Sequence, residues 1–386
     1  MKTFAGIRDS VATRGPAVSS DPAALEEGYY LATQWQLMRR RFRSHKLALI
    51  GATVLIVLYL TTLLGEFFAP YDSFRRFADY PFAPPQRLRF IDQGRVSLRP
   101  FVYGYERFRD PESLRWRFTV DRSLRYPLSF VVRGDEYYVL GLFPTDLHLF
   151  GVDGEEAHLF LFGTDKLGRD LFSRNIRAAR ISLTIGLVGV TISFILGCIL
   201  GGISGYYGGA VDTLIQRVIE FLISIPSIPL WMALAASLPN DWPPIRVYFG
   251  ITIILSVISW TSLARVVRSK LLELREADFV MAAKIAGARE GEIVRRHLLP
   301  SFLSYLIVSL TLSIPAMILG ETALSFLGIG IQPPALSWGA LLQSAQNVRS
   351  VALAPWLFIP GLFIVATVLA YNFVGNGLRD AADPYT

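Results

Sequence analysis

Cysteine and charge are both scarce in this chain of 386 residues. The only cysteine is Cys198, which excludes a disulfide framework or a cysteine-based metal site within the chain. Charged residues make up 18%, against about 25% in typical soluble domains. Hydrophobic residues make up 52% and are concentrated in blocks. This combination excludes an ordinary soluble domain and indicates membrane spans.

Motifs for catalysis are also missing. The sequence has no glycine-rich phosphate loop followed by Lys-Ser or Lys-Thr. Its apolar blocks lack the paired acids of an intramembrane protease, a nucleophile–base pair, and the chain of Asp, Glu and His that relays protons. We therefore predict a non-catalytic transmembrane chain without cofactor or metal. If it takes part in active transport, the energy must come from another chain.

The net charge of +7 does not indicate nucleic acid. The basic residues cluster beside apolar blocks, which is typical of the cytoplasmic flanks of membrane spans, so we expect a lipid bilayer and no nucleic acid as partner. Residues 1–30 have no apolar core of a cleavable signal peptide. We expect the first span to serve as an uncleaved anchor.

Six blocks approach the length of about 20 apolar residues that a helix needs to cross a bilayer. They cover residues 47–67, 181–205, 219–238, 247–267, 302–326 and 352–375. Basic runs before the first block and between the fourth and fifth predict a cytoplasmic location for both regions. The fold expected is an all-α polytopic membrane protein with both termini in the cytoplasm.

These boundaries divide the chain into five parts. They are a cytoplasmic tail (1–46), a first transmembrane helix (47–67), an insert (68–180), a five-helix core (181–378) and a second cytoplasmic tail (379–386). The insert is expected to be extracytoplasmic, since long loops translocate largely regardless of charge. Strand-like runs at 114–120, 128–132, 137–142 and 158–162 predict that it contains β-structure. The alternative is a partly ordered loop.

Two features inside the spans stand out. Gly197, Gly201 and Gly205 recur every four residues, which clears one helix face for close packing and implies no chemistry. Glu321 lies within the fifth span, where ionisable residues are functional candidates. It could line a solvated cavity or contact a neighbouring subunit, although a structural role is favoured.

The loop 268–300 between the fourth and fifth spans predicts a short helix–turn–helix. The first helix should end near Ala286, with Gly287 at the turn. The second should run over 290–297 and stop at Pro300. A solvated loop that only obeys the positive-inside rule is the alternative.

The spacing of Ala282 and Ala283, Gly287, and Leu299 and Pro300 resembles the EAA loop of ABC importer permeases. Met281 replaces the glutamate of the family, and Asp278 lies one turn earlier. The resemblance implies that this loop is the coupling helix that docks into the nucleotide-binding subunit. It implies an ATPase-coupling set that consists of Asp278, Ala282, Ala283, Gly287, Leu299 and Pro300.

Three further stretches are similar to the C-subunit type of oligopeptide and dipeptide permeases. They are 162–170 (FGTDKLGRD), 324–339 (LSFLG, QPP and SWG) and 375–384, where Asn376 stands in place of the usual acid. The resemblance implies an importer of peptides in the inner membrane. Its partners would be a homologous second permease, two cytoplasmic ATP-binding subunits that hydrolyse ATP, and an extracytoplasmic solute-binding protein.

The long insert departs from most members of this subfamily, so the solute stays open. Oligosaccharides such as α-galactosides, opines and nickel are alternatives within the same class. An ion-coupled secondary transporter is the alternative outside it, and it predicts an internal repeat with broken helices in matching positions. No convincing repeat is visible. A polytopic membrane enzyme would need the catalytic groups that the spans lack.

Overall fold

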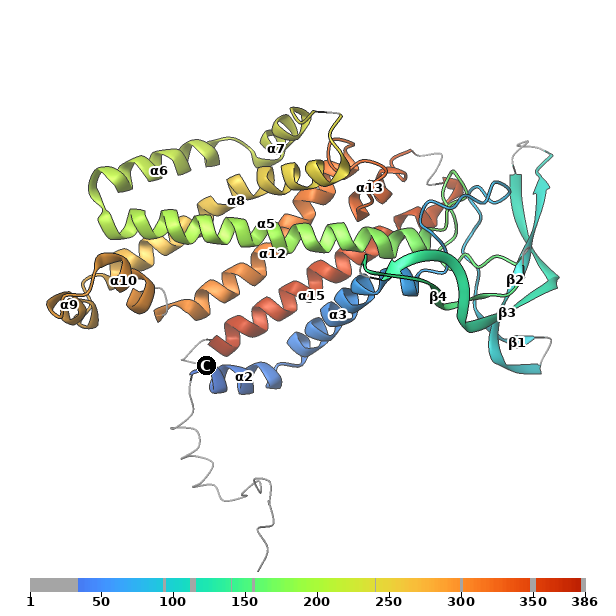
Figure 1. Cartoon of the computed structure of the whole chain (residues 1–386), viewed down its shortest axis with the longest axis horizontal. Coiled ribbons are helices and arrows are strands. Elements are labelled where there is room, and N and C mark those ends of the chain that lie inside the picture. Colours follow the sequence, from blue (N-terminus) through green and yellow to red (C-terminus); the bar gives the residue numbers. More distant parts are fainter. Residues whose placement is uncertain are drawn as a thin grey trace, which may run out of the picture.

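The computed structural model describes residues 34–92, 95–111, 116–139, 141–154, 157–239, 241–298, 301–347 and 352–382. The molecule is elongated, with long helices side by side and a group of strands at one end (Figure 1). Within the described residues, five helical segments are long and apolar enough to cross a membrane. They are α3 (Lys46–Leu63), α5 (Leu171–Tyr207), α8 (Pro244–Leu274), α12 (Leu303–Phe326) and the segment Pro355–Ala382, formed by the 3-10 turn η2 (Pro355–Phe358) and α15 (Ile359–Ala382).

The third predicted span, 219–238, is not one straight helix. Two helices, α6 (Gly209–Ser224) and α7 (Ser227–Ala236), are bent by 88° where they meet. The cause is Pro226, because a proline pushes the preceding residue out of the helical region. Ile225 accordingly has extended angles, φ −95° and ψ 129°. A sixth crossing exists only if the bent pair counts as one span, so the total is five to six.

The glycine stripe of α5 packs against α8, as predicted. A Cβ atom at Gly201 would lie 2.4 Å from the carbonyl oxygen of Ala264, and one at Gly205 would lie 2.7 Å from that of Arg268. At Gly197 the neighbour is the side chain of Leu263. Only residues without a side chain allow the two backbones to approach this closely.

The first and last spans also pack together. Gly51 of α3 faces the carbonyl oxygen of Ala370 in α15, where a Cβ would lie 2.6 Å away. Further along the pair, the hydroxyls of Tyr59 and Tyr371 are 2.6 Å apart. A short helix, α2 (Gln34–Ser44), precedes α3 and also contacts α15. These contacts fix α2 and the end of α15 at the same end of the bundle (Figure 1).

The strands follow the short helix α4 (Gly65–Phe68) and precede α5. They form an antiparallel sheet in the order β1 (Arg89–Asp92), β2 (Arg95–Arg109), β3 (Trp116–Val139) and β4 (Phe143–Val152). The first half of β3 pairs with β2, with Phe101 opposite Pro127, and its second half pairs with β4, with Leu128 opposite Val152. The prediction of a β-containing insert is confirmed.

Individual strands differ from the prediction. The runs at 114–120, 128–132 and 137–142 all overlap one long strand, β3, and no predicted run covers β1, β2 or β4. The run 158–162 is not a strand. Its backbone bonds instead to loop side chains, with Leu159 N donating to the Tyr71 hydroxyl (2.8 Å) and Phe160 N to Gln86 Oε1 (2.7 Å).

Candidate functional site

The predicted helix–turn–helix exists at the end of the molecule opposite the strands (Figure 1). Helix α9 (Asp278–Ile285) is followed by α10 (Glu290–Ile293), which continues as one π-helical turn, η1 (Val294–Leu298). Gly287 has φ +82°, the left-handed conformation that glycine adopts most easily. The predicted turn at this residue is confirmed.

The hydrogen bonds around Gly287 form a Schellman motif. Gly287 N donates to Lys284 O at 3.0 Å, and Ala288 N donates to Ala283 O at 3.1 Å. In this motif a hydrophobic contact joins the residues at the two ends of the longer bond. Ala283 and Ala288 both pack against the same hydrophobic cluster. The turn is therefore a fixed structure that aims α10 back toward the bundle.

The inner face of this segment is anchored on the spans. Val280 of α9, Ile293 of α10 and Leu298 of η1 are buried in one cluster with residues of α8 and the start of α12. Burying an aliphatic side chain contributes about 1.5–3 kcal/mol. Three such anchors make it energetically costly to move α9 independently of the spans.

The outer face carries unusually many exposed apolar groups. Phe279 and Met281 are exposed, and Ile285 retains 86% of its accessible surface. The small residues Ala282 and Gly287 lie on the surface beside them. An apolar helix face that the described part of its own chain leaves exposed is typical of a protein–protein contact.

An ion pair fixes the neighbouring ends of the spans. The guanidinium of Arg268 in α8 binds the carboxylate of Asp212 in α6, with Nη2 2.6 Å from Oδ2. Ser204 of α5 donates a hydrogen bond to the same carboxylate at 2.5 Å. Three helices therefore meet at one charged cluster.

The residues expected to couple to an ATPase are placed as follows. Asp278 is exposed in the first turn of α9, and Ala283 is half-buried against the bundle. Leu299 and Pro300 lie outside the described residues, as does the end of the C-terminal stretch, 383–386. The structure thus brings Asp278, Ala282, Ala283 and Gly287 onto one short segment.

Glu321 is fully buried within this chain. Its Oε1 accepts a hydrogen bond from the Ser325 hydroxyl at 2.7 Å. Ser182 of α5 and Ser337, which caps α13 (Trp338–Gln343), also interact with the carboxylate. Glu321 therefore joins three elements near their contact with the buried Trp338.

The stretch 162–170 forms a second structural site that the sequence did not reveal. The carboxylate of Asp165 accepts hydrogen bonds from the backbone N–H groups of Leu167 (2.8 Å) and Arg169 (3.0 Å). It also forms ion pairs with Arg169 (2.7 Å) and the buried Arg174 (3.2 Å). This one carboxylate fixes both its own loop and the first turns of α5.

Asp170 begins α5 as its N-cap. Its Oδ2 accepts hydrogen bonds from the N–H and the hydroxyl of Ser173, each at 2.7 Å. Burial raises the pKa of the Asp170 carboxyl to about 6, and the Ser173 hydrogen bonds oppose that rise.

Two loop contacts complete this second site. Trp356 of η2 donates to the carbonyl oxygen of Thr164 at 2.9 Å. The backbone of Gly168 touches Phe77 so closely that a Cβ would lie 2.0 Å from the Phe77 oxygen. The stretch 162–170 therefore joins the loop 69–87 to α5 and η2. Only the three-dimensional contacts identify this role.

The apolar helices and the anchored helix–turn–helix define a polytopic subunit of a membrane transporter. The chain belongs to the family of binding-protein-dependent transport system inner membrane components, whose model matches residues 176–386. A second model, the N-terminal TM domain of oligopeptide transport permease C, matches residues 33–85. The protein is a permease subunit of an ABC importer, as the sequence motifs predicted.

Named relatives agree with the family. The dipeptide transport system permease protein DppC of Bacillus subtilis (strain 168) is 40% identical over 225 residues, which cover 58% of this chain and 68% of that protein. The oligopeptide transport system permease protein OppC of Haemophilus influenzae is 37% identical over 262 residues, 68% of this chain and 82% of that protein. Among solved structures, the inward-facing MetNI methionine ABC transporter has a TM-score of 0.42 at 20% identity, covering 54% of this chain and 96% of that chain.

Proposed function

We propose that this permease imports peptides, from dipeptides to longer oligopeptides. The proposal is carried by one observation: relatives matched over most of their length are named as dipeptide and oligopeptide permeases. The match of residues 33–85 to a domain of oligopeptide permease C supports it. Oligosaccharides, opines and nickel are the alternative solutes.

The helix–turn–helix is proposed as the contact with a cytoplasmic ATP-binding subunit, where ATP is hydrolysed. Its exposed apolar face, which includes Met281 and Ile285, would enter a groove on that subunit. Its buried face would pass the motion on, because Val280 and Ile293 are packed on the spans. A rigid element between two moving parts transmits a rotation without absorbing it.

The orientation follows from this contact. With α9 in the cytoplasm, α2 and the end of α15 would lie there too. At that end, His45 Nε2 is 3.4 Å from Asp380 Oδ2. Both terminal tails, 1–46 and 379–386, would then be cytoplasmic. The strands within 68–180 would be extracytoplasmic, since they lie at the other end of the bundle (Figure 1).

The complete importer would contain this chain, a homologous second permease, two ATP-binding subunits and an extracytoplasmic solute-binding protein. We propose the strands as a lid or docking surface for that binding protein. Glu321 is proposed to hold the outer ends of α5, α12 and α13 together, and its complete burial within one chain supports this structural role.

Uptake by a deletion strain complemented with this chain tests the substrate. Labelled dipeptides, a pentapeptide, raffinose and nickel are compared with and without depletion of cellular ATP. ATP-dependent rescue of peptide uptake alone is expected. ATP-dependent rescue of the uptake of another solute class would replace peptides as the proposed solute. Rescued uptake that persists without ATP would contradict coupling to an ATPase.

A deletion tests the strands separately. Residues 88–154 are replaced by a short Gly-Ser linker, which keeps the loop 69–87 that packs on 157–170. Weaker binding of the solute-binding protein by an otherwise assembled importer is expected. Unchanged affinity would exclude a docking role.

A further inference from the structure

The hairpin formed by β3 and β4 ends in an exposed apolar tip. Val139 pairs with Phe143, and Tyr138 pairs with Pro144. Leu142 and Phe143 keep 70% and 69% of their accessible surface, and Tyr138 is similarly exposed. Among the described residues of the tip, these three are large and apolar or aromatic, and none of the described helices or strands covers them.

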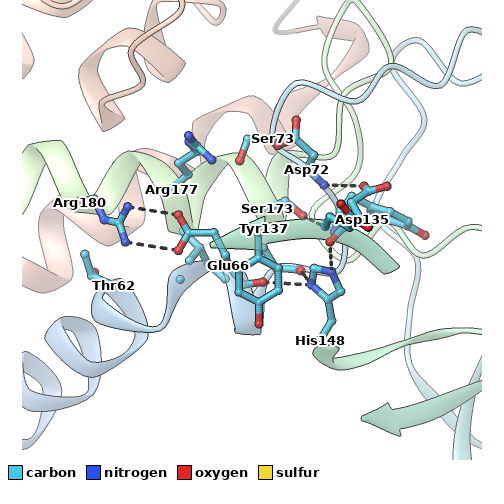
Figure 2. A pocket seen from close by; sticks show the side chains of 15 residues that line it. Thr62, Glu66, Asp72, Ser73, Asp135, Tyr137, His148, Ser173, Arg177 and Arg180 are labelled. Atoms are coloured by element: carbon cyan, nitrogen blue, oxygen red, sulfur yellow. Dashed lines mark hydrogen bonds and ion pairs between the residues drawn. The ribbon is translucent and has the colours of Figure 1, made fainter. Parts of the chain in front are cut away.

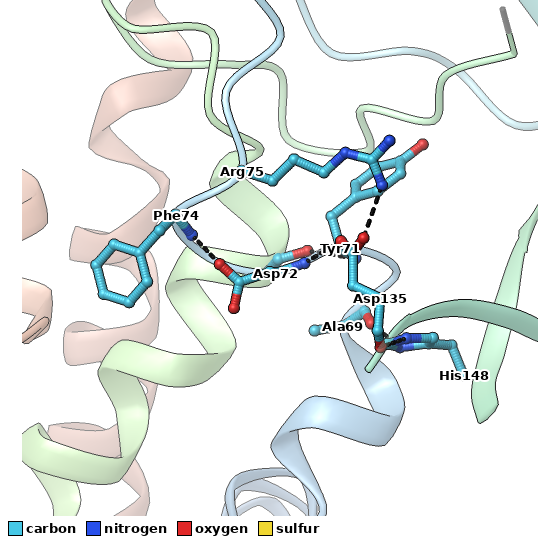
Figure 3. Close-up of polar contacts among 8 residues, drawn as sticks. Ala69, Tyr71, Asp72, Phe74, Arg75, Asp135 and His148 are labelled. Atoms are coloured by element: carbon cyan, nitrogen blue, oxygen red, sulfur yellow. Dashed lines mark hydrogen bonds and ion pairs between the residues drawn. The ribbon is translucent and has the colours of Figure 1, made fainter. Parts of the chain in front are cut away.

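The hairpin is held firmly against the end of the first span (Figure 3). The carboxylate of Asp135 accepts a hydrogen bond from Asp72 N (2.8 Å) and binds the guanidinium of Arg75 (2.8 Å). On the paired strand, the buried His148 places Nδ1 2.5 Å from Ala69 O and Nε2 3.0 Å from Asp135 O. Both strands are thereby tied to the loop that directly follows α4.

This attachment brings the hairpin to the level of membrane-spanning residues. Tyr137 shares one pocket with Thr62, in the last turns of α3, and with Arg180 of α5 (Figure 2). Arg180 lies nine residues after the start of α5, which is about 14 Å along the helix axis. Arg180 also pairs with Glu66 at 3.2 Å. Figure 2 shows Tyr137 between Asp135 and Thr62, so β3 runs toward the spans as it approaches the tip.

The last turns of α3 present exposed leucines. Leu60 and Leu63, in its last turns, are exposed although α3 is apolar enough to span a membrane. Two backbone donors of the turn are bonded within it, Gly141 N to Tyr138 O (3.2 Å) and Leu142 N to Val139 O (2.9 Å). Such a turn can enter the interfacial region without leaving these backbone donors unpaired.

We propose that the tip of the β3–β4 hairpin, with Tyr138, Leu142 and Phe143, inserts into the lipid interface beside the outer end of α3. Aromatic rings are favoured at the headgroup level, and aliphatic side chains gain by leaving water. The exposed Arg177, on the same pocket as Tyr137, is placed to meet lipid phosphates. The hairpin would anchor the strands at a fixed height on the membrane.

Lipid quenching of a site-specific fluorophore tests the proposal on the full chain. Cys198 is replaced by Ser, and a single cysteine is introduced as Leu142→Cys and labelled. The protein is placed in nanodiscs whose phospholipids carry a quencher near the headgroup. The matched control is Leu98→Cys on β2, because Leu98 is 98% exposed on the same sheet but far from the hairpin tip. We expect about twofold or stronger quenching at position 142 and little at position 98.

Several outcomes overturn the proposal. The absence of quenching at position 142 would remove the tip from the interface, and equal quenching at both positions would show that the whole sheet lies on lipid. A shielded label whose signal changes only when the solute-binding protein is added would assign the tip to that protein. Phe143→Cys serves as a second labelling position if the Leu142 variant does not fold, and it must give the same result.

Discussion

The two ends of the molecule are attached to the same helices by different means. The α9 end (α9, α10 and η1) is anchored by aliphatic side chains such as Val280 and Ile293, packed into the spans. The strand end (β1–β4 with the loops 69–87 and 157–170) is attached through carboxylates, backbone carbonyls and a buried histidine. Apolar packing holds the α9 end rigidly on the spans and leaves its other face exposed. Polar attachments fix the position of the strands, which form a separate and larger unit.

The largest effect should follow from disrupting the contact between 162–170 and the loop 69–87. Gly168→Ala adds a methyl group 2.0 Å from the Phe77 oxygen at a residue with φ +69°. Overpacking and left-handed strain together should cost about 3–5 kcal/mol. We expect little folded protein in the membrane fraction, measured by quantitative immunoblot and thermal unfolding.

Gly141→Ala is the matched control for this variant. Gly141 has a similar φ of +74°, but nothing lies within 4 Å of its Cβ position. It should show the strain alone, about 1–2 kcal/mol. Equal losses in the two variants would mean that contact with Phe77 contributes nothing.

At the α9 end, Gly287→Glu should abolish ATP-driven uptake while the chain stays in the membrane. No atom lies within 4 Å of a Cβ at this position, so the charge meets solvent in the isolated chain and would meet a partner in the importer. Uptake and membrane content are measured together. Gly287→Asn is the control, because Asn tolerates the left-handed conformation; uptake should be largely retained. Normal uptake by the Glu variant would contradict the coupling role.

A smaller loss is expected where the helices themselves meet. Gly201→Ala places a methyl group 2.4 Å from the Ala264 oxygen, which should destabilise the α5–α8 pair by about 1–3 kcal/mol. In Gly202→Ala the nearest atom is 3.9 Å away, so this variant should unfold like the wild type. Thermal unfolding in one detergent compares the two, and identical midpoints would exclude close packing as the reason for the stripe.

The smallest effect should come from the hairpin attachment. Asp135→Asn removes a charge-assisted bond to Arg75 that is partly exposed, so about 1 kcal/mol of local stability should be lost. Faster hydrogen exchange of β3 and β4 amides, with unchanged exchange in α5, is the expected result. Asp146→Asn breaks only a loose pair with Arg133, at 3.8 Å, and should leave exchange unchanged. Equal exchange in both variants would leave His148 as the main attachment.

Much of the bundle could be predicted from the sequence because apolar length is a local property. Two of the six predicted spans, 181–205 and 247–267, lie within single helices, and 302–326 exceeds α12 by one residue. Helix α5 begins at Leu171, ten residues before the predicted start. The span expected at 219–238 is instead bent by 88° near Pro226, because a proline in the sequence indicates a break but not its angle. The strands were harder, because the pairing of β2 with β3 depends on contacts distant in the sequence.

The sequence by itself determined the class of protein, the number of apolar spans to within one, and the turn at Gly287, since each depends on residues close together in the chain. Only the tertiary structure decided which face of α9 is free, that Glu321 is enclosed by its own chain, and that 162–170 joins the loop 69–87 to α5 and η2. These depend on which distant backbones and side chains meet, and burial or exposure exists only after they have packed.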